Sequence, residues 1–131
     1  MFSPLGPTGS LDFYSVTPCR VFDTRSGAQA LISGVPRNVQ ITGLCSIPPD
    51  AVAVSLNLTA ISPSSNGWIM LFPSNDIPQL ISTLNFSNGM NRTNNAIAFL
   101  ATDQSGTLGA QALLDGGGQV DLVLDVNGFF R

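Results

Sequence analysis

Residues Ala51 to Ala60 alternate between larger apolar side chains and small or polar ones. The first set is Val52, Val54, Leu56 and Leu58, and the second is Ala51, Ala53, Ser55, Asn57 and Thr59. Alternation with a period of two is typical of a strand that places one face in a core. The opposite face is small and uncharged, so it suits contact with another protein surface about as well as contact with water. We expect this stretch to be a central strand of the protein.

Eight further stretches have strand character and are separated by turn residues such as Gly, Pro, Asn and Ser. They are Leu11 to Val16, Cys19 to Arg25, Arg37 to Thr42, Trp68 to Phe72, Leu80 to Phe86, Asn94 to Ala101, Thr107 to Leu114 and Val120 to Phe130. About nine short strands at a spacing of roughly ten residues indicate a sandwich or a barrel. The prediction is an all-β fold, a single-domain antiparallel β-sandwich of the jelly-roll-like kind, over residues 11–131.

Residues 1–10 form a different kind of segment, an extended N-terminal arm. Pro4 and Pro7 exclude a helix there and favour a polyproline-like backbone. An apolar arm of this kind could lie along the sheet edge of a neighbouring subunit. The residues expected to make that contact are Phe2, Pro4, Leu5, Pro7, Leu11 and Phe13.

Charged residues make up only 10% of the 131 residues, against about 25% in a typical soluble protein. All five cations are Arg, all eight anions are Asp, and the net charge is −3. This balance offers no electrostatic footprint for nucleic acid, and no apolar run is long enough to insert into a membrane. Low charge also weakens the repulsion between copies. The composition therefore fits either a neutral soluble domain or a surface that is buried against copies of itself.

Cys19 and Cys45 are the only cysteines, and the chain has no His. A zinc site is therefore not expected, and no other cofactor is indicated. The spacing is far from that of a redox dithiol, which leaves a disulfide or two buried thiols. We expect the disulfide, which implies an oxidising compartment and an extracellular or cell-surface location.

Four charged residues are candidates for one site. Asp23 and Arg25 lie two apart on a predicted strand, and Arg20 and Asp125 could join them in a partly buried cluster. Such a cluster could bind a carboxylate or a sugar, but an ion pair that sets the strand register is the favoured interpretation. Trp68 and Tyr14 could stack on a sugar, although single aromatic residues in β domains more often belong to the core.

No catalytic group of the usual kind is present. Without His or Lys the common general bases are missing, so the prediction is that the protein is not an enzyme. Asp121 and Asp125 share a strand face in the manner of a glycosidase acid pair, but aspartates on the exposed face of an edge strand explain them as well. Sequons at Asn57, Asn85 and Asn91 match the glycosylation pattern by chance in a chain rich in Asn and Thr.

Several segments occur in an order that resembles a known module. They are TPCRVFDTR at Thr17 to Arg25, CSIP at Cys45 to Pro48, AVAVSLNLT at Ala51 to Thr59, GWIMLFP at Gly67 to Pro73, STLNF at Ser82 to Phe86, RTN at Arg92 to Asn94 and VLDVNGFF at Val123 to Phe130. Together they resemble a β-rich module of secreted and cell-surface proteins of environmental bacteria. The resemblance covers about residues 13–130 and implies a secreted bacterial β domain, with no enzymatic activity and no assigned ligand.

Two functional hypotheses follow. The first is a non-enzymatic extracellular structural protein that self-assembles into a filament, fibre or surface layer, with the arm or a strand exchanged between subunits. The second is a lectin-like carbohydrate-binding or adhesion module of a bacterial surface protein. The expected partners are copies of the same chain in the first case and glycans in the second.

Overall fold

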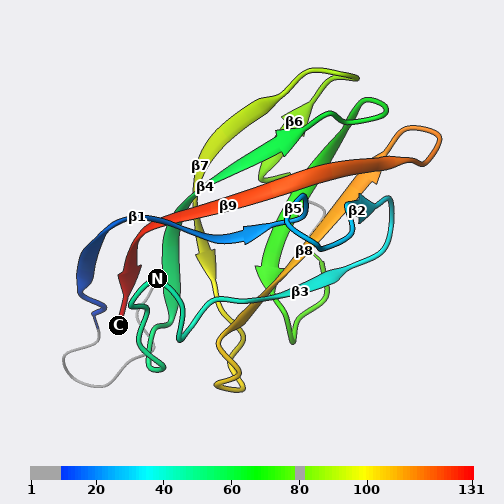
Figure 1. Ribbon diagram of the computed structural model, residues 1–131. Coiled ribbons are helices and arrows are strands. Elements are labelled where there is room, and N and C mark those ends of the chain that lie inside the picture. The colour runs from blue at the N-terminus through cyan, green and yellow to red at the C-terminus, as the bar shows by residue number, and fades with distance from the viewer. Residues whose placement is uncertain (1–9, 79–81) are drawn as a thin grey trace.

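The protein is an all-β sandwich, in agreement with the prediction from the sequence. The structure is a computed structural model that describes residues 10–78 and 82–131. In these residues the chain forms nine strands, arranged in two antiparallel sheets that pack face to face (Figure 1). No helix in the described stretches is long and apolar enough to cross a membrane.

The first sheet has the strand order β1-β9-β4-β7, and the short β2 pairs with the start of β9. Its strands are β1 (Phe13–Asp23), β9 (Gln119–Phe130), β4 (Ala53–Ile61), β7 (Arg92–Phe99) and β2 (Leu31–Ile32). The second sheet has the order β3-β8-β5-β6. Its strands are β3 (Arg37–Gln40), β8 (Thr107–Leu114), β5 (Gly67–Pro73) and β6 (Leu84–Phe86).

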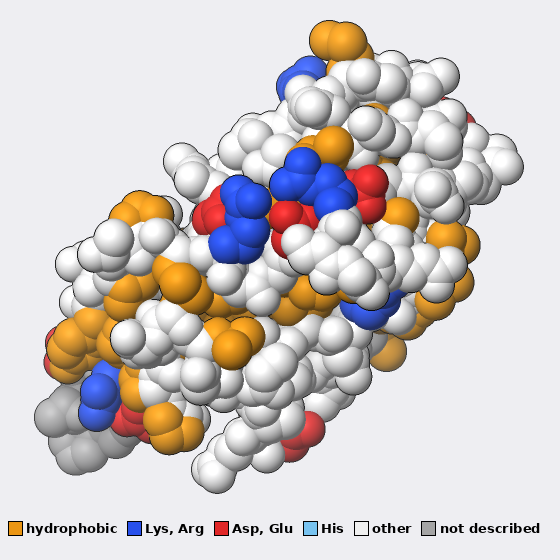
Figure 2. Space-filling model, viewed as in Figure 1, with side chains coloured by type: hydrophobic (Ala, Val, Ile, Leu, Met, Phe, Trp, Pro, Cys, Tyr) orange, Lys and Arg blue, Asp and Glu red, His pale blue; other side chains and the backbone are white. Residues whose placement is uncertain are grey.

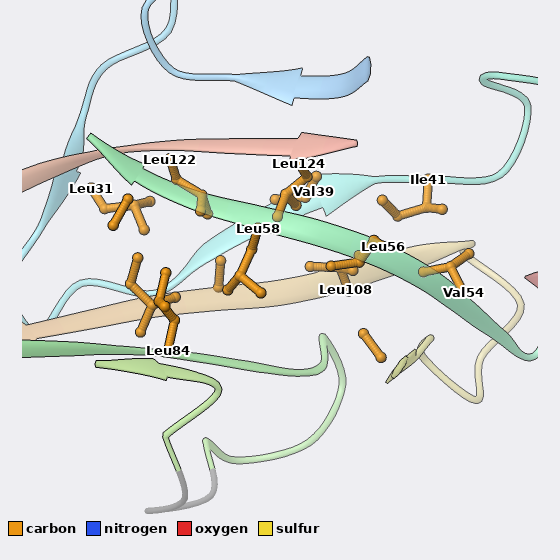
Figure 3. Packing of buried hydrophobic residues seen from close by; sticks show 14 of the residues in the cluster. Leu31, Val39, Ile41, Val54, Leu56, Leu58, Leu84, Leu108, Leu122 and Leu124 are labelled. Carbon is orange, nitrogen blue, oxygen red and sulfur yellow. The ribbon is translucent and has the colours of Figure 1, made fainter. Parts of the chain in front are cut away.

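The core lies between the two sheets, and β4 crosses it as the sequence pattern predicts (Figure 3). Val54, Leu56 and Leu58 are fully buried there. Leu108 on β8 and Leu124 on β9 are buried in the same cluster. Each such side chain contributes about 1.5–3 kcal/mol relative to an exposed position. The apolar residues that alternate along β4 therefore form part of the core between the two sheets.

Val52 differs from the prediction, because 38% of its surface is exposed. It precedes the first residue of β4, where its N–H donates to the Phe130 carbonyl and its own carbonyl accepts from Leu100 N–H. The hydrophobic alternation continues to Val52, but the opposite sheet does not cover this end of the strand.

The two strands predicted at Leu11 to Val16 and Cys19 to Arg25 are one strand, β1, with an interruption. Ser15 is opposite Gly128 and Cys19 is opposite Val126, so the pairing with β9 shifts around Pro18. Proline lacks a backbone N–H and is tolerated at a bulge on an edge strand, so it does not end this strand. The strand ends at Asp23, two residues before the predicted limit.

Two other predicted segments also differ from the structure. The loop expected between Ser26 and Val35 contains the short strand β2. Of the strand expected at Leu80 to Phe86, only Leu84–Phe86 is strand, although Thr83 N–H still donates to the Ile69 carbonyl of β5 at 2.8 Å. Residues 79–81 lie outside the described residues.

Candidate functional site

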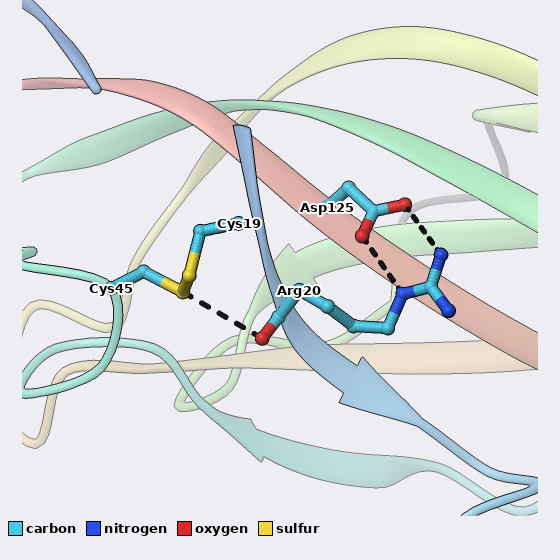
Figure 4. Close-up of a disulfide and its surroundings, with 4 residues drawn as sticks. All are labelled: Cys19, Arg20, Cys45 and Asp125. Atoms are coloured by element: carbon cyan, nitrogen blue, oxygen red, sulfur yellow. Dashed lines mark hydrogen bonds and ion pairs between the residues drawn. A yellow bond between two sulfur atoms is a disulfide. The ribbon is translucent and has the colours of Figure 1, made fainter. Parts of the chain in front are cut away.

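The disulfide joins β1 to the turn-rich crossing that follows β3 (Figure 4). Cys19 and Cys45 are 26 positions apart, with their Cα atoms 5.8 Å from each other. Closing a loop of this size stabilises the fold by about 3–4 kcal/mol in the chain-entropy model. Cys45 Sγ also lies 3.6 Å from the carbonyl oxygen of Arg20, the next residue along β1. The disulfide therefore holds the crossing against the strand that carries the predicted ion pairs.

Arg20 and Asp125 form the first part of the predicted cluster. They are opposite each other in the β1–β9 register. Arg20 Nε donates to Asp125 Oδ1 at 2.9 Å and a terminal guanidinium nitrogen donates to Oδ2 at 3.3 Å. This bidentate contact raises the pKa of Arg20, first through the hydrogen bond and then through the charge of Asp125. Half of the Arg20 side chain is exposed, so this ion pair has its main effect on the register of β1 against β9 rather than on stability.

Asp23 and Arg25 form the second part. Asp23 Oδ1 accepts from the Arg25 backbone N–H at 2.9 Å and from Arg25 Nε at 3.0 Å. The hydrogen bond from the Arg25 side chain holds the pKa of Asp23 below its ordinary value, against desolvation, which raises it. Arg20 also approaches Asp23, at 3.5 Å. The structure therefore brings the four predicted residues together, and each carboxylate in the group already has an arginine partner.

Thr24 completes this corner, although the sequence analysis did not single it out. It is 1% exposed, and its Oγ1 donates to Asp121 Oδ1 at 2.7 Å. The same oxygen accepts from the Leu122 backbone N–H at 2.9 Å, and Thr24 N–H donates to the Leu122 carbonyl at 3.1 Å. The burial of Thr24 could not be predicted from the sequence, because this residue stands between two charged residues. The contact locks the end of β1 onto β9.

The acidic pair on β9 does not form a catalytic arrangement. Asp121 bonds to Thr24, and Asp125 bonds to Arg20. The strand that carries them is also central, between β1 and β4, and is not the edge strand assumed from the sequence. In the described residues, no group of three or more acidic or cysteine residues could hold a metal ion. The cluster is therefore a structural joint between two strands.

The two aromatic candidates for sugar stacking lie in different sheets. Trp68 is partly buried on β5, opposite Leu113 and Asn85. Tyr14 is on β1, where its ring stacks on Phe129 with centroids 5.2 Å apart. The geometry does not combine Trp68 and Tyr14 into one platform.

Two of the residues expected to contact a neighbour, Leu11 and Phe13, lie where the chain enters the sandwich. Asp12 exchanges two backbone hydrogen bonds with Arg131, and Phe13 is the first residue of β1. The backbone next to Leu11 and that of Phe13 are therefore paired within their own chain. The remaining predicted contact residues, Phe2, Pro4, Leu5 and Pro7, lie outside the described residues.

Exposed apolar side chains cover one end of the outer face of the first sheet. The register places Phe13, Phe130, Ala53 and Phe99 in one row across β1, β9, β4 and β7. Phe13 and Phe99 are each about half exposed, and Ile97, two residues before Phe99, is 60% exposed. These five residues are called the apolar end below. The ring centroids of Phe13 and Phe130 lie 5.0 Å apart, whereas Ala53 in the middle of the row is only 1% exposed.

Charged and hydrophobic side chains occupy different parts of this outer face. Charged side chains gather in the middle of the view, over β1 and β9, while hydrophobic ones spread toward the end where both termini lie (Figure 2). An open hollow of about 520 Å³ adjoins that end of the sandwich. It is lined by Pro49, Asp50, Ala51, Val52, Leu100, Ala101, Thr102, Gln104 and Gly106. Among the described residues of this lining, Asp50 alone is ionisable, and it pairs with Arg131 at 3.1 Å.

No family model and no curated protein matches the chain. Two solved structures of the Tobacco streak virus coat protein resemble it. The first has a TM-score of 0.53 and 12% identity, over 98% of this chain and 91% of the coat protein. The second, described as a dimer, has a TM-score of 0.50 and 10% identity, over 94% and 89%. At this identity the likeness shows a shared jelly-roll-like β-sandwich fold.

Proposed function

We propose that this chain is a non-enzymatic structural protein that assembles with copies of itself outside the cell. The observation that carries the proposal is the apolar end, where Phe13, Phe99 and Ile97 are each at least half exposed on one sheet face. Exposed apolar side chains gathered at one end of a sheet face typically mark a contact with another molecule. The charged cluster elsewhere on this sheet consists of Arg20, Asp23, Arg25 and Asp125, which are paired with one another.

Three further observations support the proposal. The protein with a similar fold is a virus coat protein, and one of its two structures is described as a dimer. The Cys19–Cys45 disulfide fits an oxidising compartment. The sequence resemblance to a module of secreted and cell-surface bacterial proteins supports the same location.

The arm is the proposed link between subunits. It leaves the sandwich at the apolar end, because Asp12 pairs with Arg131 and Phe13 pairs with Phe130. An extended segment of ten residues reaches about 30 Å, which is enough to cross to a neighbouring subunit. Phe2 and Leu5 would bury their side chains on that neighbour. If the contact does not close on itself, the product is a filament or a layer.

The test is sedimentation velocity over a hundredfold range of concentration, with electron microscopy of the same samples. We expect the full chain to form oligomers or polymers, and Phe13→Ser to weaken them. Ile77→Ser is the matched control, because Ile77 is 74% exposed on a loop outside the apolar end. A chain that stays monomeric at every concentration overturns the proposal. Deletion of residues 1–10 without any effect on assembly overturns the role of the arm.

A further inference from the structure

One sheet edge lacks the features that normally prevent pairing with another chain. In the part of the chain that the structure describes, the first sheet ends at β1 and β7 and the second sheet ends at β3 and β6. An edge strand presents unpaired N–H and C=O groups, so proteins usually shorten it, bend it or charge it. The four edge strands differ in how many of these protective features they have.

Three edges are protected. The strand β1 is interrupted around Pro18 and carries the paired charges of Arg20 and Asp23. The strands β3 and β6 have four and three residues, which is too short for an extensive ladder. By contrast, β7 pairs with β4 over eight residues from Arg92 to Phe99, without a register shift.

The amino-acid composition of β7 also favours pairing with another strand. It contains no Pro, and Arg92 at its first position is its one charged residue. Six of its eight residues are exposed, including Thr93, Asn95, Ile97 and Phe99, which alternate along the outer face. Long, uncharged and exposed strands are the ones that accept a further strand.

We propose that β7 pairs antiparallel with β7 of a second copy across a two-fold axis, which joins the two first sheets into one. This inference rests on the proposed self-assembly and names the surface that carries it. A two-fold axis perpendicular to the sheet places identical strands side by side in opposite directions, so each supplies the partners that the other needs. With the outer faces matched, the axis passes near Asn95 or Ala96.

Charge and chain chemistry favour a second copy over the arm as the occupant. Antiparallel pairing holds the two Arg92 side chains about 20 Å apart, so they do not repel each other. The arm is a poorer strand, because Pro4 and Pro7 are three positions apart. One of them therefore falls on the side that pairs, whichever side that is, and it supplies no N–H.

The first test uses a single cysteine near the proposed axis. We expect Asn95→Cys, alone or mixed with Ile97→Cys, to give a covalent dimer under mild oxidation, seen on a non-reducing gel. Asn38→Cys is the matched control, since Asn38 is an exposed asparagine on the protected edge strand β3. We expect no covalent dimer from that variant.

The second test places a charge on the edge. We expect Ile97→Lys to raise the dimer dissociation constant at least tenfold, because two lysines would flank the axis. Ile77→Lys makes the same change on an exposed loop and should leave the constant unaltered. Circular dichroism and thermal unfolding of both variants verify that each is folded.

The outcomes separate this inference from the proposed function. Self-association that persists equally in both lysine variants, without a cross-link at Asn95, overturns the β7 contact and leaves the proposed function standing. A dimer that is lost on deletion of residues 1–10 and is indifferent to Ile97→Lys assigns the contact to the arm and away from the β7 edge, which also overturns the inference. A monomer at all concentrations overturns both.

Discussion

Thr24 and Asp121 lie 97 positions apart in the sequence, and their side chains meet in a hydrogen bond of 2.7 Å at the corner between β1 and β9. The Thr24 hydroxyl also accepts from Leu122 N–H, so one buried oxygen joins two strands. The ion pairs of Arg20 and Arg25 surround this contact on the exposed side. The buried bond, rather than the visible charges, is expected to account for most of the stability of this corner.

Replacing Thr24 by Val tests that expectation. The variant keeps the size and branching of the side chain but leaves Leu122 N–H and Asp121 without their partner. We expect a loss of about 1–3 kcal/mol in the free energy of unfolding, measured by urea denaturation. Thr17→Val, at an exposed position on β1, should change it by less than about 0.5 kcal/mol. A Thr24→Val protein as stable as the parent would contradict the assignment.

Acid should destabilise the protein partly through Asp23. Its pKa is lower in the folded protein than the 3.8 of the free group, chiefly because the Arg25 side chain donates to it. The folded state therefore binds this proton less readily than the unfolded state. The resulting stability is present above the unfolded pKa and is lost as the pH falls through the folded pKa.

We expect the free energy of unfolding to be nearly constant from pH 8 to about 5 and to fall below about pH 4. Asp23→Asn should reduce this fall without abolishing it, because hydrogen bonds from Ser105 also lower the pKa of Asp103. Denaturation midpoints from pH 2 to 8 measure the effect. Asp76→Asn, on an exposed loop, is the control, and equal acid slopes for the two variants would exclude Asp23 as a source.

Removing the disulfide should cost far more than removing a surface charge. The double variant Cys19→Ser and Cys45→Ser frees the crossing that follows β3 from β1. We expect a loss of about 3–4 kcal/mol, from the greater freedom of the unfolded chain. Guanidinium denaturation of this variant, and of the parent protein with and without reductant, should give matching shifts. Little change in either would contradict a stabilising cross-link.

Gly128 provides a test of how the apolar end is built. A Cβ atom at this position would lie 2.3 Å from Cζ of Phe13, so Gly128→Ala must displace the ring. We expect the loss of the Phe13–Phe130 contact, worth about 0.5–1.5 kcal/mol, and a shift of the Phe13 ring signals in NMR spectra. In a Phe13→Ala background the same change should cost much less. Additive effects of the two substitutions would show that the ring does not rest on Gly128.

Much of the fold follows from local patterns. The burial of Val54, Leu56 and Leu58 was predictable, because a period of two requires that only one face of a strand enters the core. The Cys19–Cys45 bond was predictable by elimination, since the chain has no other cysteine and no His. The meeting of Arg20 with Asp125 followed from charge pairing, although their exact register did not.

Other features depend on neighbours that are distant in the sequence. The exposure of Val52 depends on where the opposite sheet ends, and the hydrophobic pattern does not indicate that position. Thr24 looks like a surface residue until β9 covers it. The order of the strands leaves β7 at an edge while β9 becomes central, because pairing and layer packing are long-range contacts whose partners no local run of residues specifies. The choice of strands, their inward faces and the cross-link thus came from the chain itself, and the assembly of a surface from Phe13, Phe99 and Ile97 required the folded sheets.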